Sequence, residues 1–166
     1  PATAKPHSYL QSDKFKLLYS GNVGDKQDWE YFIAFAKALP QDLYEIIIVG
    51  AGAKYQQLKE TVHQPNISFY DPVPFAELSD LLCSADVHFL FQKTEVLDTV
   101  MPSKLLGMMA SEKPSLVLGN VASEVKTIME HANAGLYFSE LNVKTAIDQL
   151  EAWRLDPELR KSMGKE

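Results

Sequence analysis

Two glycines and a lysine follow the first strand that the sequence predicts. The segment reads SGNVGDK over residues 20–26, and glycines let the backbone approach a bound molecule closely. The helix expected next presents unpaired N–H groups and the positive end of its dipole to this loop. Lys26 adds a compact positive charge at the helix end where a lysine disfavours the isolated helix. We therefore predict a ligand-binding loop around Lys26; the alternative is a tight turn with a solvated lysine.

A second cradle is predicted where Pro102 begins a helix. Proline suits the first helical position, so the N–H groups of Ser103, Lys104 and Leu105 are left unpaired and point outward. Lys104 supplies positive charge beside them. The carboxylate of Asp98 lies just upstream and can accept hydrogen bonds from hydroxyls. This combination suits a ligand that is part diphosphate and part polyol.

Glycines also follow the second predicted strand. Gly50 and Gly52 resemble the start of a dinucleotide fingerprint, and Asp71 follows at about the expected distance for a ribose ligand. Tyr55 occupies the third glycine position, however, and the motif follows the second strand instead of the first. We favour a glycine corner that admits a base or a ribose, and an NAD site is the alternative.

A regular alternation of strands and helices must position these loops. Apolar strands are predicted at residues 15–20, 46–49, 67–70, 87–91, 115–118 and 136–138. Helices are predicted at residues 28–39, 53–62, from 74 onward, 102–111, 123–131, 141–153 and 157–163. Strand and helix alternate six times, and the strands are mostly apolar throughout, which is typical of a parallel sheet covered on both faces. The fold class is α/β: a Rossmann-like, doubly wound, six-stranded parallel sheet with helices on both faces. Such sheets bind ligands outside the carboxyl ends of their strands.

Composition excludes several classes of function. The chain has 166 residues, the size of a single domain, and its formal net charge of −6 argues against general nucleic-acid binding. Cys83 is the only cysteine, so neither an intrachain disulfide nor a thiolate metal cluster can form. The four histidines share no ligand spacing, and His88 lies inside an apolar strand, where we interpret it as structural. No apolar run approaches the ~18 residues of a membrane span. We expect no metal and no nucleic-acid partner.

Five segments in register resemble a known family. They read YSGNVGDKQ, IIIVGAG, NISFYDPVPFAELSDLLCSADVHF, MPSKLLGMMASEKP and DPELRKSMG. Together they resemble the carboxy-terminal domain of a retaining glycosyltransferase of the GT-B fold, family 4. The MPSK segment is similar to a variant found in bacterial surface-polysaccharide transferases of the colanic acid, capsule and O-antigen type. The resemblance extends from about Phe15 to Met163.

The resemblance implies a nucleotide-sugar donor, with UDP favoured over GDP and no cofactor or metal. Lys26 and the backbone at Gly21 and Asn22 would face the diphosphate. The backbone amides of Ser103 and Lys104 would hold the same phosphates from the helix side. Fixed amides and the two lysines would stabilise the charge that builds on the leaving group.

The base and the sugar would lie on either side of this diphosphate. Gly50, Gly52 and the Val73-Pro74 turn would border the base. Many members of the family carry two glutamates at positions that fall here on Thr99 and Gly107. Gly107 cannot bind ribose hydroxyls, so that contact is in doubt.

Other positions of the sugar site also depart from the family. Asp98, next to Thr99, is our candidate ligand for the sugar hydroxyls. Asn22 stands where many members have an arginine, so one phosphate charge is missing.

The same resemblance divides the complete enzyme into two domains. Residues 1–12 would be an interdomain linker and residues 13–166 the carboxy-terminal, nucleotide-sugar-binding domain. The amino-terminal acceptor domain is absent from this chain, so we expect an excised fragment or one chain of a split enzyme. Because the reaction takes place between two domains, this one should bind donor but turn over little or nothing. We expect a cytoplasmic location, and contact with the inner face of the cell membrane through the missing half stays open.

Two other functions remain as alternatives. An NAD-dependent oxidoreductase domain would use Gly50, Gly52 and Asp71, and would bind nicotinamide cofactor without UDP or GDP. A non-catalytic α/β domain that binds a partner protein would have no nucleotide affinity at all.

Overall fold

The computed structural model describes residues 5–10, 12–95 and 103–163. The strands are β1 (Phe15–Asn22), β2 (Tyr44–Ala51), β3 (Ile67–Tyr70), β4 (Val87–Phe91), β5 (Ser115–Leu118) and β6 (Gly135–Phe138). The helices are α1 (Trp29–Ala38), α2 (Tyr55–Thr61), α3 (Phe75–Ser84), α4 (Ser103–Ala110), α5 (Glu124–Ala132), α6 (Val143–Leu155) and α7 (Pro157–Ser162). A short 3-10 helix, η1 (Ser8–Leu10), precedes β1. Within these ranges no helix is both long enough and apolar enough to cross a bilayer.

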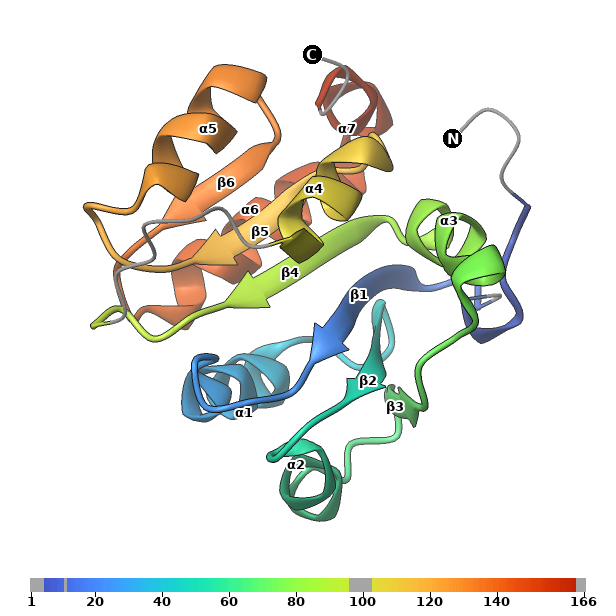
Figure 1. Ribbon diagram of the computed structural model, residues 1–166. Helices are drawn as coiled ribbons and strands as arrows, with labels where there is room; N and C mark the ends of the chain where they lie inside the picture. The colour runs from blue at the N-terminus through green and yellow to red at the C-terminus, as the bar shows by residue number, and fades with distance from the viewer. Residues whose placement is uncertain (1–4, 11, 96–102, 164–166) are drawn as a thin grey trace.

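All six strands pair in parallel, in the order β3-β2-β1-β4-β5-β6. The chain moves from β1 to β3 in one direction and from β4 to β6 in the other, and right-handed crossovers then place the two sets of helices on opposite faces. Helices α1, α2 and α6 cover one face, and α3, α4 and α5 cover the other (Figure 1). The predicted doubly wound sheet is confirmed.

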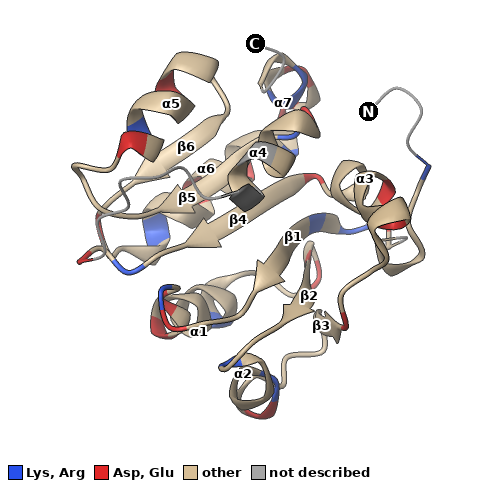
Figure 2. Cartoon of the chain, in the orientation of Figure 1, with Lys and Arg blue, Asp and Glu red and all other residues tan. Residues whose placement is uncertain are grey.

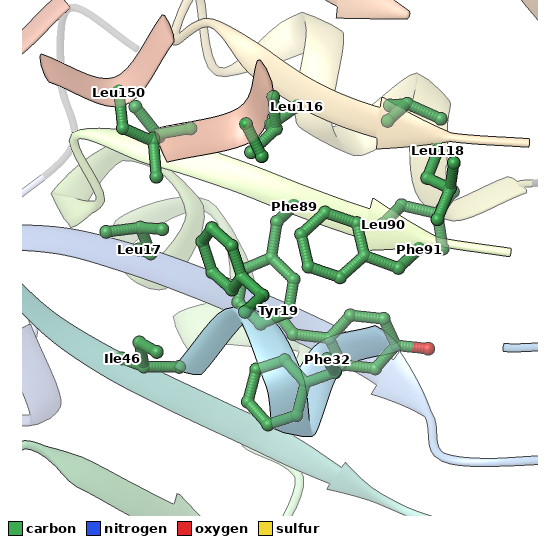
Figure 3. Close-up of a cluster of buried hydrophobic side chains, with 14 of the residues drawn as sticks. Leu17, Tyr19, Phe32, Ile46, Phe89, Leu90, Phe91, Leu116, Leu118 and Leu150 are labelled. Atoms are coloured by element: carbon green, nitrogen blue, oxygen red, sulfur yellow. The ribbon is translucent and has the colours of Figure 1, made fainter. Parts of the chain in front are cut away.

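The larger part of the core lies between the sheet and α1. Leu17 and Tyr19 of β1 point to this face with Phe89 of β4 (Figure 3). The ring of Phe32 on α1 stacks on Phe89, with centroids 5.5 Å apart and planes 5° apart. Aromatic pairs of this kind add about 0.5–1.5 kcal/mol beyond the area they bury. The central strands are thus packed against α1 through buried side chains.

A smaller core lies on the opposite face, beneath α3. Leu18 of β1, Ile47 and Val49 of β2 and Leu81 of α3 are all buried there. Leu10 of η1 joins the same cluster and is 3% exposed. The segment before β1 is therefore part of the packed structure.

Two element boundaries differ from the prediction in a way that matters for the site. Pairing of β1 with β2 continues through Gly21↔Gly50 and Asn22↔Ala51, so Gly21 and Gly50, predicted to lie in turns, are the last but one residues of two strands. Helix α3 begins at Phe75, and Pro74 precedes it as an extended N-cap residue (ψ 149°). The prediction that Pro74 occupies the first turn is wrong, because its extended ψ places it outside the helical backbone.

Candidate functional site

The strand order reverses between β1 and β4, and this switch point fixes where a ligand can bind. From β1 the chain goes on to β2 on one side, whereas from β4 it goes on to β5 on the other, and in doubly wound sheets ligands bind at the carboxyl ends of the two strands where the order reverses. The arrowheads of Figure 1 all point to this edge of the sheet. The loops predicted to bind a ligand after β1, β2 and β3, and residues 92–95 after β4, therefore start from one edge of the sheet.

A pocket of about 290 Å³ opens at the β1, β2 and β3 side of this edge. Its lining residues are Ser20, Gly21, Asn22, Val49, Gly50, Ala51, Pro72, Val73 and Leu78. The structure thus brings together four residues that the sequence predicts for nucleotide binding: Gly21 and Asn22 at the end of β1, Gly50 at the end of β2, and Val73 in the turn after β3. Gly52 and Pro74 do not line the pocket, although both are exposed at its rim.

The pocket floor requires glycine at the paired strand ends. A Cβ on Gly50 would overlap the carbonyl oxygen of Gly21 on the neighbouring strand. Gly21 itself has φ 143°, a conformation that side chains rarely adopt. Because neither position can carry a side chain, the floor is bare backbone that a ligand can approach closely.

The pocket walls are apolar and uncharged. Val49, Val73 and Leu78 provide aliphatic surface, while Ser20 and Asn22 provide hydrogen-bonding groups. None of the described residues lining it carries a charge. Such a pocket suits a neutral ring with polar edges and gives no counter-charge to a phosphate.

Lys26 lies across β1 from this pocket, beside the end of β4. Its carbonyl oxygen accepts a hydrogen bond from the N–H of Lys93 (2.9 Å), and the N–H of Asp28 donates to the carbonyl of Phe91 (2.7 Å). The Lys26 side chain is exposed and forms no ion pair within the described parts of the chain. The hydrogen-bonded loop therefore holds an exposed lysine, with no ion-pair partner among the described residues, where the strand order reverses.

The N-terminus of α1 is less open than predicted. Asp28 is its N-cap, and the Asp28 carboxylate accepts a hydrogen bond from the N–H of Tyr31 (2.9 Å). Asp25 in the same loop pairs with Lys54 at 3.4 Å. We predicted that the first N–H groups of this helix are unpaired. This is wrong for the N–H of Tyr31, because the Asp28 carboxylate already accepts its hydrogen bond. Positive charge at this loop comes from Lys26.

Helix α4 supplies the other predicted phosphate cradle. Its first residue is Ser103, so the backbone of Ser103 and Lys104 lies in the first turn, as predicted. The Leu105 side chain is fully buried, which leaves only its backbone amide for a ligand. Asp98 and Thr99, the predicted ligands of the sugar hydroxyls, lie outside the described residues.

Gly107 lies where α4 meets α3. A Cβ there would be 3.2 Å from Cδ1 of Leu82. This is the position that carries a ribose-binding glutamate in many members of the resembling family. Here it forms part of a helix-to-helix contact.

Several residues that shape the site are absent from the predicted set. Buried Gln27 accepts a hydrogen bond from the N–H of Gly24 (2.9 Å) and so closes the Lys26 loop. Asn120, after β5, donates its amide to the carbonyl of Thr94 (2.6 Å), and the Tyr137 hydroxyl donates to the Asn120 carbonyl (2.7 Å). Both Gln27 and Asn120 belong to loops that follow strands, which is the signal that could have identified them.

The position of Tyr55 does not fit a dinucleotide-binding fingerprint at Gly50 and Gly52. Tyr55, at the third glycine position, begins α2, and its ring packs edge-on against Phe69 of β3 (5.9 Å between centroids). It therefore fills the space that the third glycine of the fingerprint keeps open for close packing of helix and strand. Asp71 is exposed beyond β3. These contacts disfavour NAD binding at Gly50 and Gly52.

The described residues give no support for a metal site or for a catalytic role of His88. No group of three His, Cys, Asp or Glu side chains among them could hold a metal ion. His88 is buried in β4 and hydrogen bonded to Ser111 at 2.9 Å. Burial lowers the pKa of His88 to about 4, so it is a neutral structural residue, as the sequence indicates. Charged residues lie mainly on helices and loops, with both signs mixed (Figure 2).

Comparison with known proteins identifies the family of this chain. A family model described as "Glycosyl transferases group 1" matches residues 3–166. The chain is 31% identical over 124 residues to the colanic acid biosynthesis glycosyl transferase WcaI of Escherichia coli strain K12, covering 73% of this chain and 30% of that protein. The chain therefore spans less than a third of that relative.

Solved structures share the fold at lower identity. WaaG, a glycosyltransferase involved in lipopolysaccharide biosynthesis, superposes with a TM-score of 0.68 and 17% identity, covering 94% of this chain and 42% of WaaG. Anabaena Alr3699/HepE, solved in complex with UDP-glucose, gives a TM-score of 0.71 and 12% identity, covering 92% of this chain and 42% of HepE. The sheet is thus the Rossmann-like sheet of GT-B glycosyltransferases.

Proposed function

Because this chain belongs to the group 1 glycosyl transferases, we propose that it is the donor-binding domain of an enzyme that transfers a sugar from a UDP-sugar. The acceptor would be a glycan or a lipid-linked sugar, the anomeric configuration would be retained, and the pathway would be polysaccharide biosynthesis. The observation that carries this proposal is the uncharged pocket built on Gly21 and Gly50, with Lys26 fixed on the other side of β1.

The two sides of β1 suit the two parts of a nucleotide. The pocket takes the base and ribose against backbone and aliphatic side chains, and its Asn22 and Ser20 can reach polar ring edges. Lys26 faces the diphosphate from the β4 side. HepE, which shares this fold, was solved with UDP-glucose, and that favours UDP over GDP.

Leaving-group stabilisation is the chemistry we propose for this half of the enzyme. When the bond between the anomeric carbon and the diphosphate breaks, negative charge grows on the phosphate oxygens, and the acceptor hydroxyl passes its proton to a phosphate oxygen of the leaving group as the new bond forms. Lys26, Lys104 and the first amides of α4, including that of Leu105, would neutralise this charge without a metal. Asp98 and Thr99 would bind the sugar hydroxyls.

The acceptor would be bound by a second, amino-terminal domain. The chain corresponds to 30% of WcaI and 42% of WaaG in length, so the whole activity is proposed for a larger assembly. The chain alone is expected to bind donor and to transfer little or no sugar. We propose a cytoplasmic location, with any contact to the membrane made by the acceptor half.

Isothermal titration of the 166-residue chain with UDP, GDP and NAD tests the proposal. We expect saturable binding of UDP that weakens in Lys26→Ala and in Lys104→Ala. Lys37→Ala, an exposed lysine in the last turn of α1, is the matched control and should bind as wild type. Binding of NAD alone would support the oxidoreductase alternative. Binding of none of the three would support a non-catalytic partner-binding domain.

A further inference from the structure

A short segment before β1 is fastened to the back of the donor pocket. We name residues 5–10 the N-terminal strap. The strap contains η1, lies against α3, and contributes Tyr9 and Leu10 to the small core beneath that helix. Its contacts connect it to both ends of the turn that forms one wall of the pocket.

Three hydrogen bonds tie the strap to α3. The N–H of Lys5 donates to the Asp80 carboxylate (2.9 Å), and the N–H of His7 donates to the hydroxyl of Ser84 (2.8 Å). The His7 ring contacts the carboxylate of Glu77 through Nε2 at 3.0 Å. His7 is 6% exposed, so this contact is made by a buried ring at the first turn of the helix.

The direction of the imidazole bond follows from its other nitrogen. Nδ1 of His7 lies 3.2 Å from the N–H of Tyr9 and accepts it. In a neutral ring, Nε2 then carries the hydrogen and donates to Glu77. The strap is thus folded onto itself and onto α3 by the same side chain.

An aromatic stack ties the strap to β3. The ring of Tyr9 lies on the ring of Tyr70, with centroids 3.8 Å apart and planes 8° apart. Tyr70 is the last residue of β3, and residues 71–74 form the turn that leads into α3 at Phe75. The strap therefore holds the turn at its start, through Tyr70, and beyond its end, through Glu77.

This turn is the side of the pocket that the sheet does not fix. Gly21 and Gly50 are held by strand pairing, whereas Pro72 and Val73 belong to a turn outside the sheet. Val73 and Leu78 pack in the same cluster as Tyr9 and Tyr70, and both also line the pocket. The distance between the two walls depends on what supports this turn from behind.

We infer that Tyr9 is a positioning residue for the donor pocket: its stack on Tyr70 fixes the 71–74 turn against the ends of β1 and β2, and so sets the affinity for the nucleoside. The inference rests on the proposed function.

Substitution at Tyr9 separates positioning from general stability. Tyr9→Ala removes the stack and is expected to weaken UDP binding roughly three- to tenfold. Tyr9→Phe keeps the ring and should restore wild-type affinity. Leu10→Ala is the matched control, because it opens the same core without touching the Tyr70 stack; it should lower the melting temperature and leave UDP affinity unchanged.

Titration calorimetry on the four proteins, at a temperature where circular dichroism shows each to be folded, distinguishes the outcomes. Tyr9→Leu replaces Tyr9→Ala if the latter does not fold. Wild-type affinity in the ring-deleted variant, or equal weakening in Leu10→Ala, overturns the inference while leaving the proposed function intact. Failure of the wild type to bind UDP or GDP overturns both.

Discussion

The two halves of the carboxyl edge are built by different means. On the β1, β2 and β3 side, a pocket of bare backbone and aliphatic side chains is created by excluding side chains at Gly21 and Gly50. On the side that faces β4, β5 and β6, side-chain hydrogen bonds fix the loops: Gln27 closes the loop after β1 that carries Lys26, and Asn120 after β5 ties to Thr94 after β4. We propose that the first half receives the neutral ring of the nucleotide and that the second places positive charge near its phosphates.

The two halves should therefore lose ligand binding through different kinds of substitution. A pocket floor made by absent side chains fails when any side chain is added, whatever its chemistry. A charged loop fails when its charge or its tether is removed. Substitutions on the two sides of β1 should therefore have separable effects on nucleoside and diphosphate binding.

The largest effect is expected from Gly50→Ala, in the first half. The new Cβ would overlap the backbone carbonyl of Gly21, so the strand ends must separate, with a loss of unfolding free energy of about 1–3 kcal/mol. We expect UDP binding to disappear, measured by titration calorimetry, with chemical denaturation reporting stability. Retained binding would show that the floor of the pocket is not used.

A pH effect of similar size is expected from His88, near the amino end of β4. Its pKa is lowered to about 4 by burial, below the unfolded value of about 6.5. The unfolded state therefore gains the proton first, and stability falls as pH drops from about 6.5 to about 4, by at most about 3 kcal/mol. Denaturation curves of wild type and His88→Gln across this window measure the difference, and exposed His131→Gln serves as control. An identical pH dependence in wild type and His88→Gln would contradict the assigned burial.

Charge removal at Lys26 should act on phosphate alone. We expect Lys26→Ala to weaken UDP about tenfold, the order of one charge-assisted contact, and to leave uridine binding unchanged. Val73→Ala, across β1, should weaken uridine and UDP by the same factor. Titrations of both ligands against both variants, at two salt concentrations, make the test. If Lys26→Ala weakened uridine and UDP equally, the proposal that Lys26 acts on the phosphates alone would be wrong.

The smallest effect is expected from Gly107→Ala in α4. Among the described residues, a Cβ at this position meets the flexible end of Leu82, at 3.2 Å, and alanine favours a helix over glycine by up to about 1 kcal/mol. We expect a melting temperature that is unchanged or slightly raised, with UDP affinity unaltered. Lost UDP affinity would indicate that this position faces the ligand after all.

The sequence predicted the fold because its signals were regular. Short apolar runs such as 46–49 placed all six strands, and glycine or proline after the first three located the loops that carry Gly21, Gly50 and Val73. Sequence spacing could not show that Asp28 caps α1, because a carboxylate near a helix start can equally point to solvent. It also could not show that Tyr9 stacks on Tyr70, since that contact joins residues 61 positions apart and depends on the packing of α3.

Amide chemical shifts of the 15N-labelled chain during titration with UDP test the central claim most directly. The account predicts saturable shifts at Gly21, Gly50 and Val73 around the pocket and at Lys26 across β1, with none at Lys161 on α7. Absence of any shift, or shifts confined to α7 and the amino ends of the strands, would contradict a donor site at the carboxyl edge of this sheet.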